Sequence, residues 1–157
     1  MPDQRESFKR PESVLVVVYT RGGEVLLLKR VDHPNFWQSV TGAMAWSEHN
    51  PRVTAQREVA EEIGLSIATD DLEDLDLVQR YSILPQWRYR YAPDVRENTE
   101  HAFALEVPGP IVLTAHPEHT EYRWLKYAEA DRLLKYDGNR TALWELNQRL
   151  RGKGPRG

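Results

Sequence analysis

The segment Arg57-Glu58-Val59-Ala60-Glu61-Glu62-Ile63-Gly64-Leu65 is the most informative part of this chain. Its three glutamates stand at positions i, i+3 and i+4, so on a helix they share one face. Carboxylates this close repel one another and reduce the stability of the helix. A hard divalent cation reverses that effect, because carboxylate oxygens are the ligands that Mg²⁺ and Mn²⁺ prefer. The segment therefore predicts a metal site for a phosphate substrate, while a solvent-exposed acidic face is the alternative interpretation.

The residues around this segment predict where its helix begins and ends. Asn50 is a good N-cap, and Pro51 suits the first helical position because its missing N–H is not needed there. Gly64 can adopt the left-handed conformation that ends many helices. We therefore expect a helix from Pro51 to Ile63.

Together with its surroundings, the segment resembles the box of the Nudix hydrolases, G-x5-E-x7-R-E-U-x-E-E-x-G-U, where U is aliphatic. Gly42 and Glu48 supply the first part, and Ile63-Gly64-Leu65 supplies the last. The match has one departure, because eight residues separate Glu48 from Arg57 where the family pattern has seven. The extra residue can lie in the loop or in the first helical turn, upstream of the glutamates. The departure therefore affects the role of Glu48 and leaves the metal face intact.

The resemblance implies an α/β protein with the Nudix fold, an α/β/α sandwich around a mixed β-sheet. The order of the patterns along the chain agrees with this architecture. We expect strands over residues 13–19, 25–30, 72–83, 98–107 and 121–125, and further helices over residues 127–134 and 138–150. Leu143, Leu146 and Leu150 form a helical stripe that we expect to pack in the core. We expect one domain over residues 1–157, with a core over about 9–150 and a basic, Gly/Pro-rich tail over 151–157.

Composition limits the remaining possibilities. The chain has 157 residues, of which 40% are hydrophobic and 29% charged, and its net charge is −3. It contains no run of 18 apolar residues, so we expect no membrane span. Its weak negative charge gives no attraction to nucleic acid. The chain has no cysteine and no apolar stretch typical of a signal peptide at its start, so we expect a cytoplasmic protein.

Several segments outside the box resemble one Nudix subgroup, the dihydroneopterin triphosphate pyrophosphatases of folate biosynthesis. They lie in order between about Lys9 and Leu150, and the second and third are the most distinctive. The segments are Lys9-Arg10-Pro11, Phe36-Trp37-Gln38-Ser39-Val40-Thr41-Gly42, Arg90-Tyr91-Ala92-Pro93, Asn98-Thr99-Glu100, Glu118-His119 and Asn139-Arg140.

This resemblance implies roles for individual residues. Glu58 and Glu62 would bind the metal, with Glu61 beside them and Glu118 supplying a further carboxylate from across the site. The substrate would contact Lys9, Arg30, Thr41, Tyr81, Ser82, Ile83 and Leu84, with Tyr136 near the same pocket. The segment from Tyr81 to Leu84 departs from the subgroup pattern, so it bears on which ring is selected. The stretch from 114 to 124 is longer than in the subgroup, and Glu118 is assigned by aligning backward from Trp124.

Some of these residues have a simpler interpretation. Lys9 and Arg30 could be solvated charges, and Glu118 with His119 could lie on the surface. We expect Arg57 to pair with Glu48 or a neighbouring carboxylate rather than to bind phosphate. Trp87, Tyr89 and Tyr91 alternate with arginines. This alternation predicts either a half-buried strand with its aromatic rings inward or a surface on which flat rings stack.

The chemistry that follows is hydrolysis of a pyrophosphate linkage in a small-molecule triphosphate. Mg²⁺, or Mn²⁺ in its place, would neutralise the phosphate oxygens, and the catalytic group would comprise Glu58, Glu61 and Arg57. We favour Glu61 as the general base. Three functions remain open: conversion of dihydroneopterin triphosphate to the monophosphate and pyrophosphate, broader hydrolysis of (d)NTPs or dinucleoside polyphosphates, and a Nudix-fold binding module without turnover. The sequence does not predict the oligomeric state.

Overall fold

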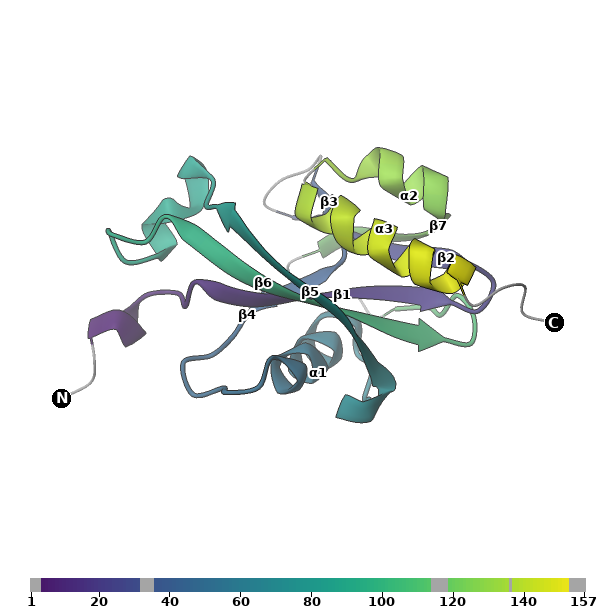
Figure 1. Ribbon diagram of the computed structural model, residues 1–157, viewed down its shortest axis with the longest axis horizontal. Coiled ribbons are helices and arrows are strands. Elements are labelled where there is room, and N and C mark those ends of the chain that lie inside the picture. The colour runs from purple at the N-terminus through teal and green to yellow at the C-terminus, as the bar shows by residue number, and fades with distance from the viewer. Residues whose placement is uncertain (1–3, 32–35, 114–118, 136, 153–157) are drawn as a thin grey trace.

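The computed structural model describes residues 4–31, 36–113, 119–135 and 137–152. In these residues one twisted sheet lies between helix α1 on one face and helices α2 and α3 on the other (Figure 1). The helices span Pro51–Ile63 (α1), Tyr127–Leu133 (α2) and Asp137–Gly152 (α3). The strands span Glu12–Thr20 (β1), Glu24–Arg30 (β2), Trp37–Gln38 (β3), Val40–Ala43 (β4), Leu72–Ser82 (β5), Glu97–Val107 (β6) and His119–Lys126 (β7). Short 3-10 helices span Gln4–Ser7, Thr69–Asp71 and Pro85–Arg90.

The sheet is mixed, as predicted. Its main order is β3-β2-β1-β6-β5, while β4 pairs with β1 and β7 pairs with β2. Strand β1 runs parallel to β6 and antiparallel to β4, and their registers set Val14 beside both His101 and Gly42. Strand β1 therefore lies between β4, which precedes α1, and β6. Through β1, the start of the box at Gly42 is only one strand away from a distant segment of the chain.

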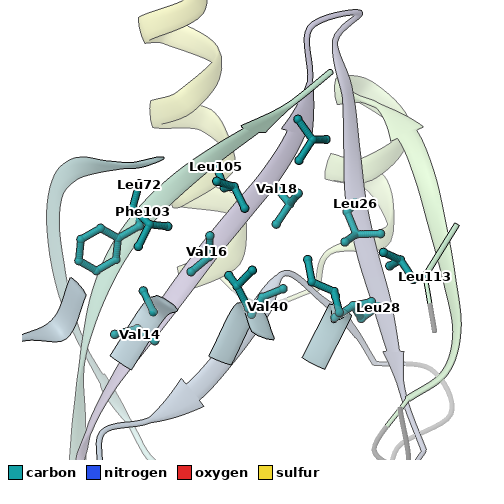
Figure 2. Packing of buried hydrophobic residues seen from close by; sticks show 14 residues of the cluster. Val14, Val16, Val18, Leu26, Leu28, Val40, Leu72, Phe103, Leu105 and Leu113 are labelled. Carbon is teal, nitrogen blue, oxygen red and sulfur yellow. The ribbon is translucent and has the colours of Figure 1, made fainter. Parts of the chain in front are cut away.

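Strand β1 is buried on both faces, and its alternate side chains supply two separate cores. On one face, Val14, Val16 and Val18 belong to the cluster drawn in Figure 2. The same cluster includes Val59 and Ile63 of α1. On the other face, Leu15 and Val17 belong to a cluster that includes Ala130 of α2 and Leu143 and Leu146 of α3. The two clusters confirm the three-layer sandwich and the prediction that the leucine stripe of the last helix lies in the core.

Helix α1 has the predicted bounds for the predicted reasons. The Asn50 side-chain oxygen accepts a hydrogen bond of 3.0 Å from the Arg52 N–H, which caps the helix. At the other end, Gly64 has φ 72°, a left-handed conformation that costs a glycine little, and its N–H donates to Ala60 O. The helix is continuous across all three glutamates, so the extra residue of the box does not interrupt the acidic face.

The strand interpretation of the segment from Trp87 to Tyr91 is wrong. Residues Pro85–Arg90 form a 3-10 helix, which starts where Trp87 N–H donates to Leu84 O at 2.9 Å. Pro85 explains the difference, because proline presets a helical φ and cannot donate to a sheet ladder. As a result the aromatic rings do not share one face, and Tyr89 is 73% exposed. Among the described helices, none combines the length and apolarity that crossing a membrane requires.

Candidate active site

The acidic face of α1 is partly buried against β4. Glu58 and Glu62 are 8% and 5% exposed, whereas the side chain of Glu61 is 54% exposed. The carboxyl group of Glu58 lies directly on the backbone of Gly42, and a Cβ atom at that position would overlap it. Gly42 is therefore required by close approach, which explains in physical terms why the box begins with glycine.

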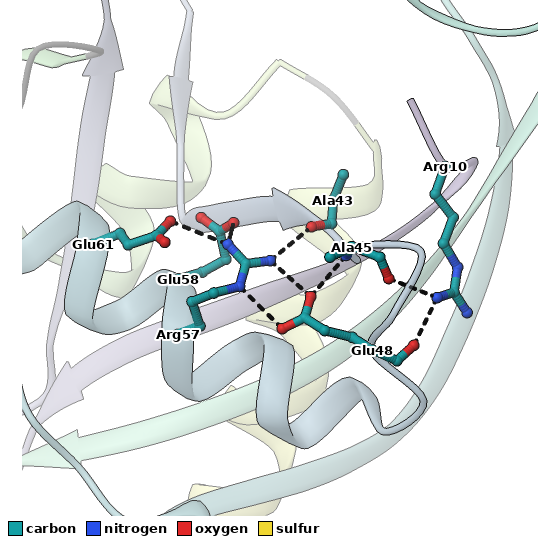
Figure 3. A network of polar contacts seen from close by, with 7 residues as sticks. All are labelled: Arg10, Ala43, Ala45, Glu48, Arg57, Glu58 and Glu61. Atoms are coloured by element: carbon teal, nitrogen blue, oxygen red, sulfur yellow. Dashed lines mark hydrogen bonds and ion pairs between the residues drawn. The ribbon is translucent and has the colours of Figure 1, made fainter. Parts of the chain in front are cut away.

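Arg57 links the box together at the base of this face (Figure 3). Its Nε and Nη2 atoms donate to the two oxygens of Glu48 at 3.0 and 2.8 Å, a bidentate pair. Its Nη1 donates to Glu58 at 2.9 Å and to Glu61 at 3.1 Å. The predicted pairing of Arg57 with Glu48 and its neighbours is confirmed. Hydrogen bonding to Arg57 is the main reason that the pKa of Glu48 falls to about 2.

The loop that precedes α1 is held by two side chains. Glu48 Oε1 accepts from the Ala45 N–H at 2.7 Å. Arg10 donates to the backbone oxygens of Ala45 and Glu48 at 2.9 and 2.7 Å. The structure therefore gives Glu48 a bracing role despite the insertion. Arg10 belongs to the Lys9-Arg10-Pro11 segment that carries the subgroup resemblance, but no role was predicted for it, because the sequence does not show that it reaches Ala45 and Glu48.

The electrostatics of the acidic face favour a bound cation. Burial and then the charge of Glu62 raise the pKa of Glu58 to about 7, although Arg57 opposes this change. A divalent cation would offset both the desolvation and the repulsion, and its preferred ligands are the carboxylate oxygens present here. Among the described residues no three acidic, His or Cys side chains are already grouped as a cation site. Glu118, the predicted further carboxylate, lies outside the described residues.

A cavity of about 300 Å³ opens beside this face. Seven of the eight predicted substrate residues line it, and the eighth, Tyr136, lies outside the described residues. The seven come from four separate parts of the chain, and they are Lys9, Arg30, Thr41, Tyr81, Ser82, Ile83 and Leu84. The structure thus brings together the residues that the subgroup resemblance implied.

The cavity combines aromatic rings with cations. Arg30 Cζ lies 5.3 Å from the centre of the Trp87 ring, which packs edge-on against Phe36 with their centres 5.7 Å apart. Lys9 Nζ lies 5.6 Å from the centre of the Tyr91 ring. Lys9 and Arg30 are therefore part of the cavity wall rather than solvated charges remote from it. Such a wall suits a flat heterocycle that carries an anionic group.

The cavity and the acidic face share one stretch of backbone. Thr41, Gly42 and Ala43 line the cavity. Gly42 is also the residue on which Glu58 lies, and Ala43 O accepts a hydrogen bond of 3.1 Å from Arg57. A ligand whose ring lies in the cavity can therefore extend an anionic chain toward the carboxylates.

The cavity also contains residues that were not predicted to contact substrate, although Trp87 and Tyr91 belong to the stripe that one interpretation gave a role in stacking flat rings. Six of them lie in the segments that carry the subgroup resemblance, so membership of those segments could have identified them. These six are Phe36, Gln38, Arg90, Tyr91, Asn98 and Asn139. Ser13, Trp87 and Gly138 lie outside those segments and are placed by strand register, by the 3-10 helix and by the start of α3. These neighbours cannot be identified before the tertiary arrangement of the strands and helices is known.

Comparison with known proteins agrees with this geometry. Residues 9–145 match the model of the NUDIX domain. A dihydroneopterin triphosphate diphosphatase of Escherichia coli (strain K12) is 41% identical over 141 residues, which cover 87% of this chain and 91% of that protein. One from Haemophilus influenzae is 37% identical over 139 residues, 87% of each chain.

Two solved structures of Nudix hydrolases superpose on this chain over most of its length. The structure of the E. coli dihydroneopterin triphosphate pyrophosphohydrolase superposes with a TM-score of 0.81 and 39% identity, covering 89% of this chain and 98% of that one. A NUDIX hydrolase from Listeria monocytogenes superposes with a TM-score of 0.75 and 30% identity, covering 92% and 97%.

Proposed function

The chain belongs to the NUDIX family, and from this membership we propose that it is a pyrophosphohydrolase whose substrate is dihydroneopterin triphosphate. The reaction would consume water and break a P–O–P linkage, leaving dihydroneopterin monophosphate and pyrophosphate. The observation that carries the proposal is the continuity between the cavity and the acidic face at Gly42 and Ala43. The two bacterial relatives that are 41% and 37% identical to this chain over the aligned residues are named for the same substrate.

The cavity offers separate partners for the two parts of this substrate. The pterin ring is flat and matches the wall that Phe36, Trp87 and Tyr91 provide. The triphosphate is highly anionic and would lie near Lys9 and Arg30 and then extend past Gly42. Burying the ring fixes the phosphate chain in position, which converts binding energy into orientation at the reacting phosphorus.

We assign the divalent cation as Mg²⁺, held by Glu58, Glu61 and Glu62 together with Glu118. When bound, it would neutralise charge on the phosphate oxygens and lower the pKa of a coordinated water. Protein side chains would accept the proton and hold the carboxylates in position. Glu61 is the most exposed of the three helical glutamates, so we assign it as the base that accepts the proton of the attacking water. Arg57 would hold the orientation of Glu48 and Glu58 without contacting the substrate.

Broader hydrolysis of nucleoside triphosphates is the second candidate, because an aromatic and cationic wall can accept any flat base. The two are separated by kcat/KM for dihydroneopterin triphosphate against a panel of (d)NTPs and dinucleoside polyphosphates with Mg²⁺. We expect the pterin substrate to exceed every nucleotide by at least tenfold. Comparable values across the panel would replace the pterin assignment with the broader one, and absence of turnover on all substrates would indicate a binding module.

A further inference from the structure

A polar cluster lies on the wall of the cavity, away from the acidic face. It consists of Ser13 from β1, Tyr81 from β5 and Asn98 and Glu100 from β6. Strand register makes them neighbours, because Ser13 pairs with Glu100 and Tyr81 pairs with Asn98. Ser13, Tyr81 and Asn98 line the cavity, and Glu100 lies behind them at 4% exposure.

The hydrogen bonds of this cluster run in one direction. Asn98 Nδ2 donates to Ser13 Oγ at 2.7 Å and to the Tyr81 hydroxyl at 3.0 Å. The Tyr81 hydroxyl donates to Glu100 Oε2 at 3.1 Å, and hydrogen bonding from Tyr81 and Ser13 acts to lower the pKa of Glu100. When Glu100 is ionised its carboxylate can only accept, so the Tyr81 hydroxyl gives it a proton. That hydroxyl must then accept from Asn98, which fixes the amide with its NH₂ group toward the cluster.

In this orientation the side-chain carbonyl oxygen of Asn98 takes part in none of the hydrogen bonds of the cluster. The Asn98 side chain is 3% exposed, and its Oδ1 atom has no hydrogen-bond partner among the described residues. Buried polar oxygens in folded proteins are nearly always paired, so an exception on a cavity wall indicates a missing ligand group. The ligand group that completes it is a hydrogen-bond donor, and on a flat heterocycle that donor is an N–H group.

We infer that Asn98 determines specificity by accepting a hydrogen bond through Oδ1 from an N–H group of the substrate ring, and that Glu100 is a positioning residue acting through Tyr81 and Ser13. The inference rests on the proposed function and deepens it, because it names the part of the ring that is recognised. The 2-amino-4-oxopyrimidine edge of dihydroneopterin carries adjacent N–H donors, and guanine carries the same edge. A ring without an N–H donor leaves the Asn98 oxygen unpaired.

The test is an equilibrium binding measurement in EDTA, which prevents metal-dependent hydrolysis, at pH 8.5, where Glu100 is ionised. The ligands are dihydroneopterin triphosphate, GTP and purine ribonucleoside triphosphate, whose base has no N–H donor. We expect the wild-type protein to bind GTP more tightly than the purine nucleotide. In Asn98→Ala, we expect Kd to rise about tenfold for dihydroneopterin triphosphate and GTP and to stay within twofold for the purine nucleotide.

Two further variants separate positioning from loss of structure. In Glu100→Leu, the ratio of Kd for the purine nucleotide to Kd for GTP should fall at least fivefold. The Kd for the purine nucleotide itself should stay unchanged. The matched control is Ser39→Ala. It removes a buried hydroxyl that also lacks a hydrogen-bond partner in the described part of the chain and is not among the residues that line the cavity. That variant should keep the wild-type preference.

Equal weakening of all three ligands in Asn98→Ala, or no weakening of any, would overturn the inference. An unchanged preference in Glu100→Leu would overturn the positioning role. Turnover with Mg²⁺ is measured separately, so failure of the proposed function and failure of this inference give different results. A protein that shows the binding preference but no hydrolysis would keep the inference and lose the enzymatic proposal.

Discussion

Replacing Glu100 by glutamine should make the stability of the protein less dependent on pH. Burial is the largest cause of the raised pKa of Glu100, which goes from 4.5 to about 7, although hydrogen bonds from Tyr81 and Ser13 oppose it. The pKa of the same carboxyl in the unfolded chain is near 4.5. The folded state therefore holds its proton more tightly, and this contribution to stability is complete below pH 4.5 and lost as the pH rises through 7.

The magnitude follows from the two pKa values. Each tenfold change in acidity is worth about 1.4 kcal/mol, so the change from 4.5 to about 7 corresponds to about 3 kcal/mol. Glutamine has nearly the same shape and stays neutral at every pH. The free energy of unfolding of Glu100→Gln minus that of the wild type should therefore rise by about 3 kcal/mol between pH 4.5 and pH 8.

Urea unfolding followed by tryptophan fluorescence measures this difference, since the chain has five tryptophans. Subtracting wild type from variant at each pH cancels the titration of all other groups. A difference that stays constant from pH 4.5 to 8 would contradict this expectation, because it would mean that the ionised Glu100 carboxyl is as well stabilised in the folded protein as in water.

Three other substitutions test separate parts of the site. Gly42→Ala should lower kcat about 100-fold or more with the fold retained by circular dichroism, because its Cβ displaces the Glu58 carboxyl; near wild-type turnover would contradict the close approach. Glu48→Gln should lose stability relative to wild type above pH 4.5, a difference that disappears as the pH falls toward the folded pKa of about 2. Acid unfolding curves that coincide would show that the pair with Arg57 contributes nothing. Trp87→Leu should raise KM for dihydroneopterin triphosphate about tenfold and change kcat little. A lower kcat with an unchanged KM would instead place Trp87 beside the reacting phosphates.

The parts of the fold that follow local rules could be predicted from the sequence. The bounds of α1 depend on Asn50, Pro51 and Gly64, each of which acts within one helical turn. The two-sided burial of β1 follows from a run of β-branched residues, and the leucine stripe of α3 follows from helical spacing. These signals lie within a few residues of the structure they specify, so no knowledge of tertiary contacts was needed.

The segment Pro85–Arg90 shows where such reasoning fails. Its alternating aromatic and basic residues match a strand, but one proline changes the backbone and sends the rings in different directions. The cluster of Ser13, Asn98 and Glu100 could not be predicted for another reason. Its members lie up to 87 positions apart in sequence, and only the register of β1 with β6 makes them neighbours. The roles of Glu118 and Tyr136 stay predictions, because both lie outside the described residues.

We propose that the acidic face of α1 and the adjoining cavity form one hydrolytic site. The most direct test of this proposal is identification of the products formed from dihydroneopterin triphosphate with Mg²⁺ by the wild type and by Glu62→Gln. We expect pyrophosphate and the monophosphate from the wild type, and a rate at least 100-fold lower from the variant with binding of the substrate retained. Release of single phosphates, or equal rates in the two proteins, would contradict the account.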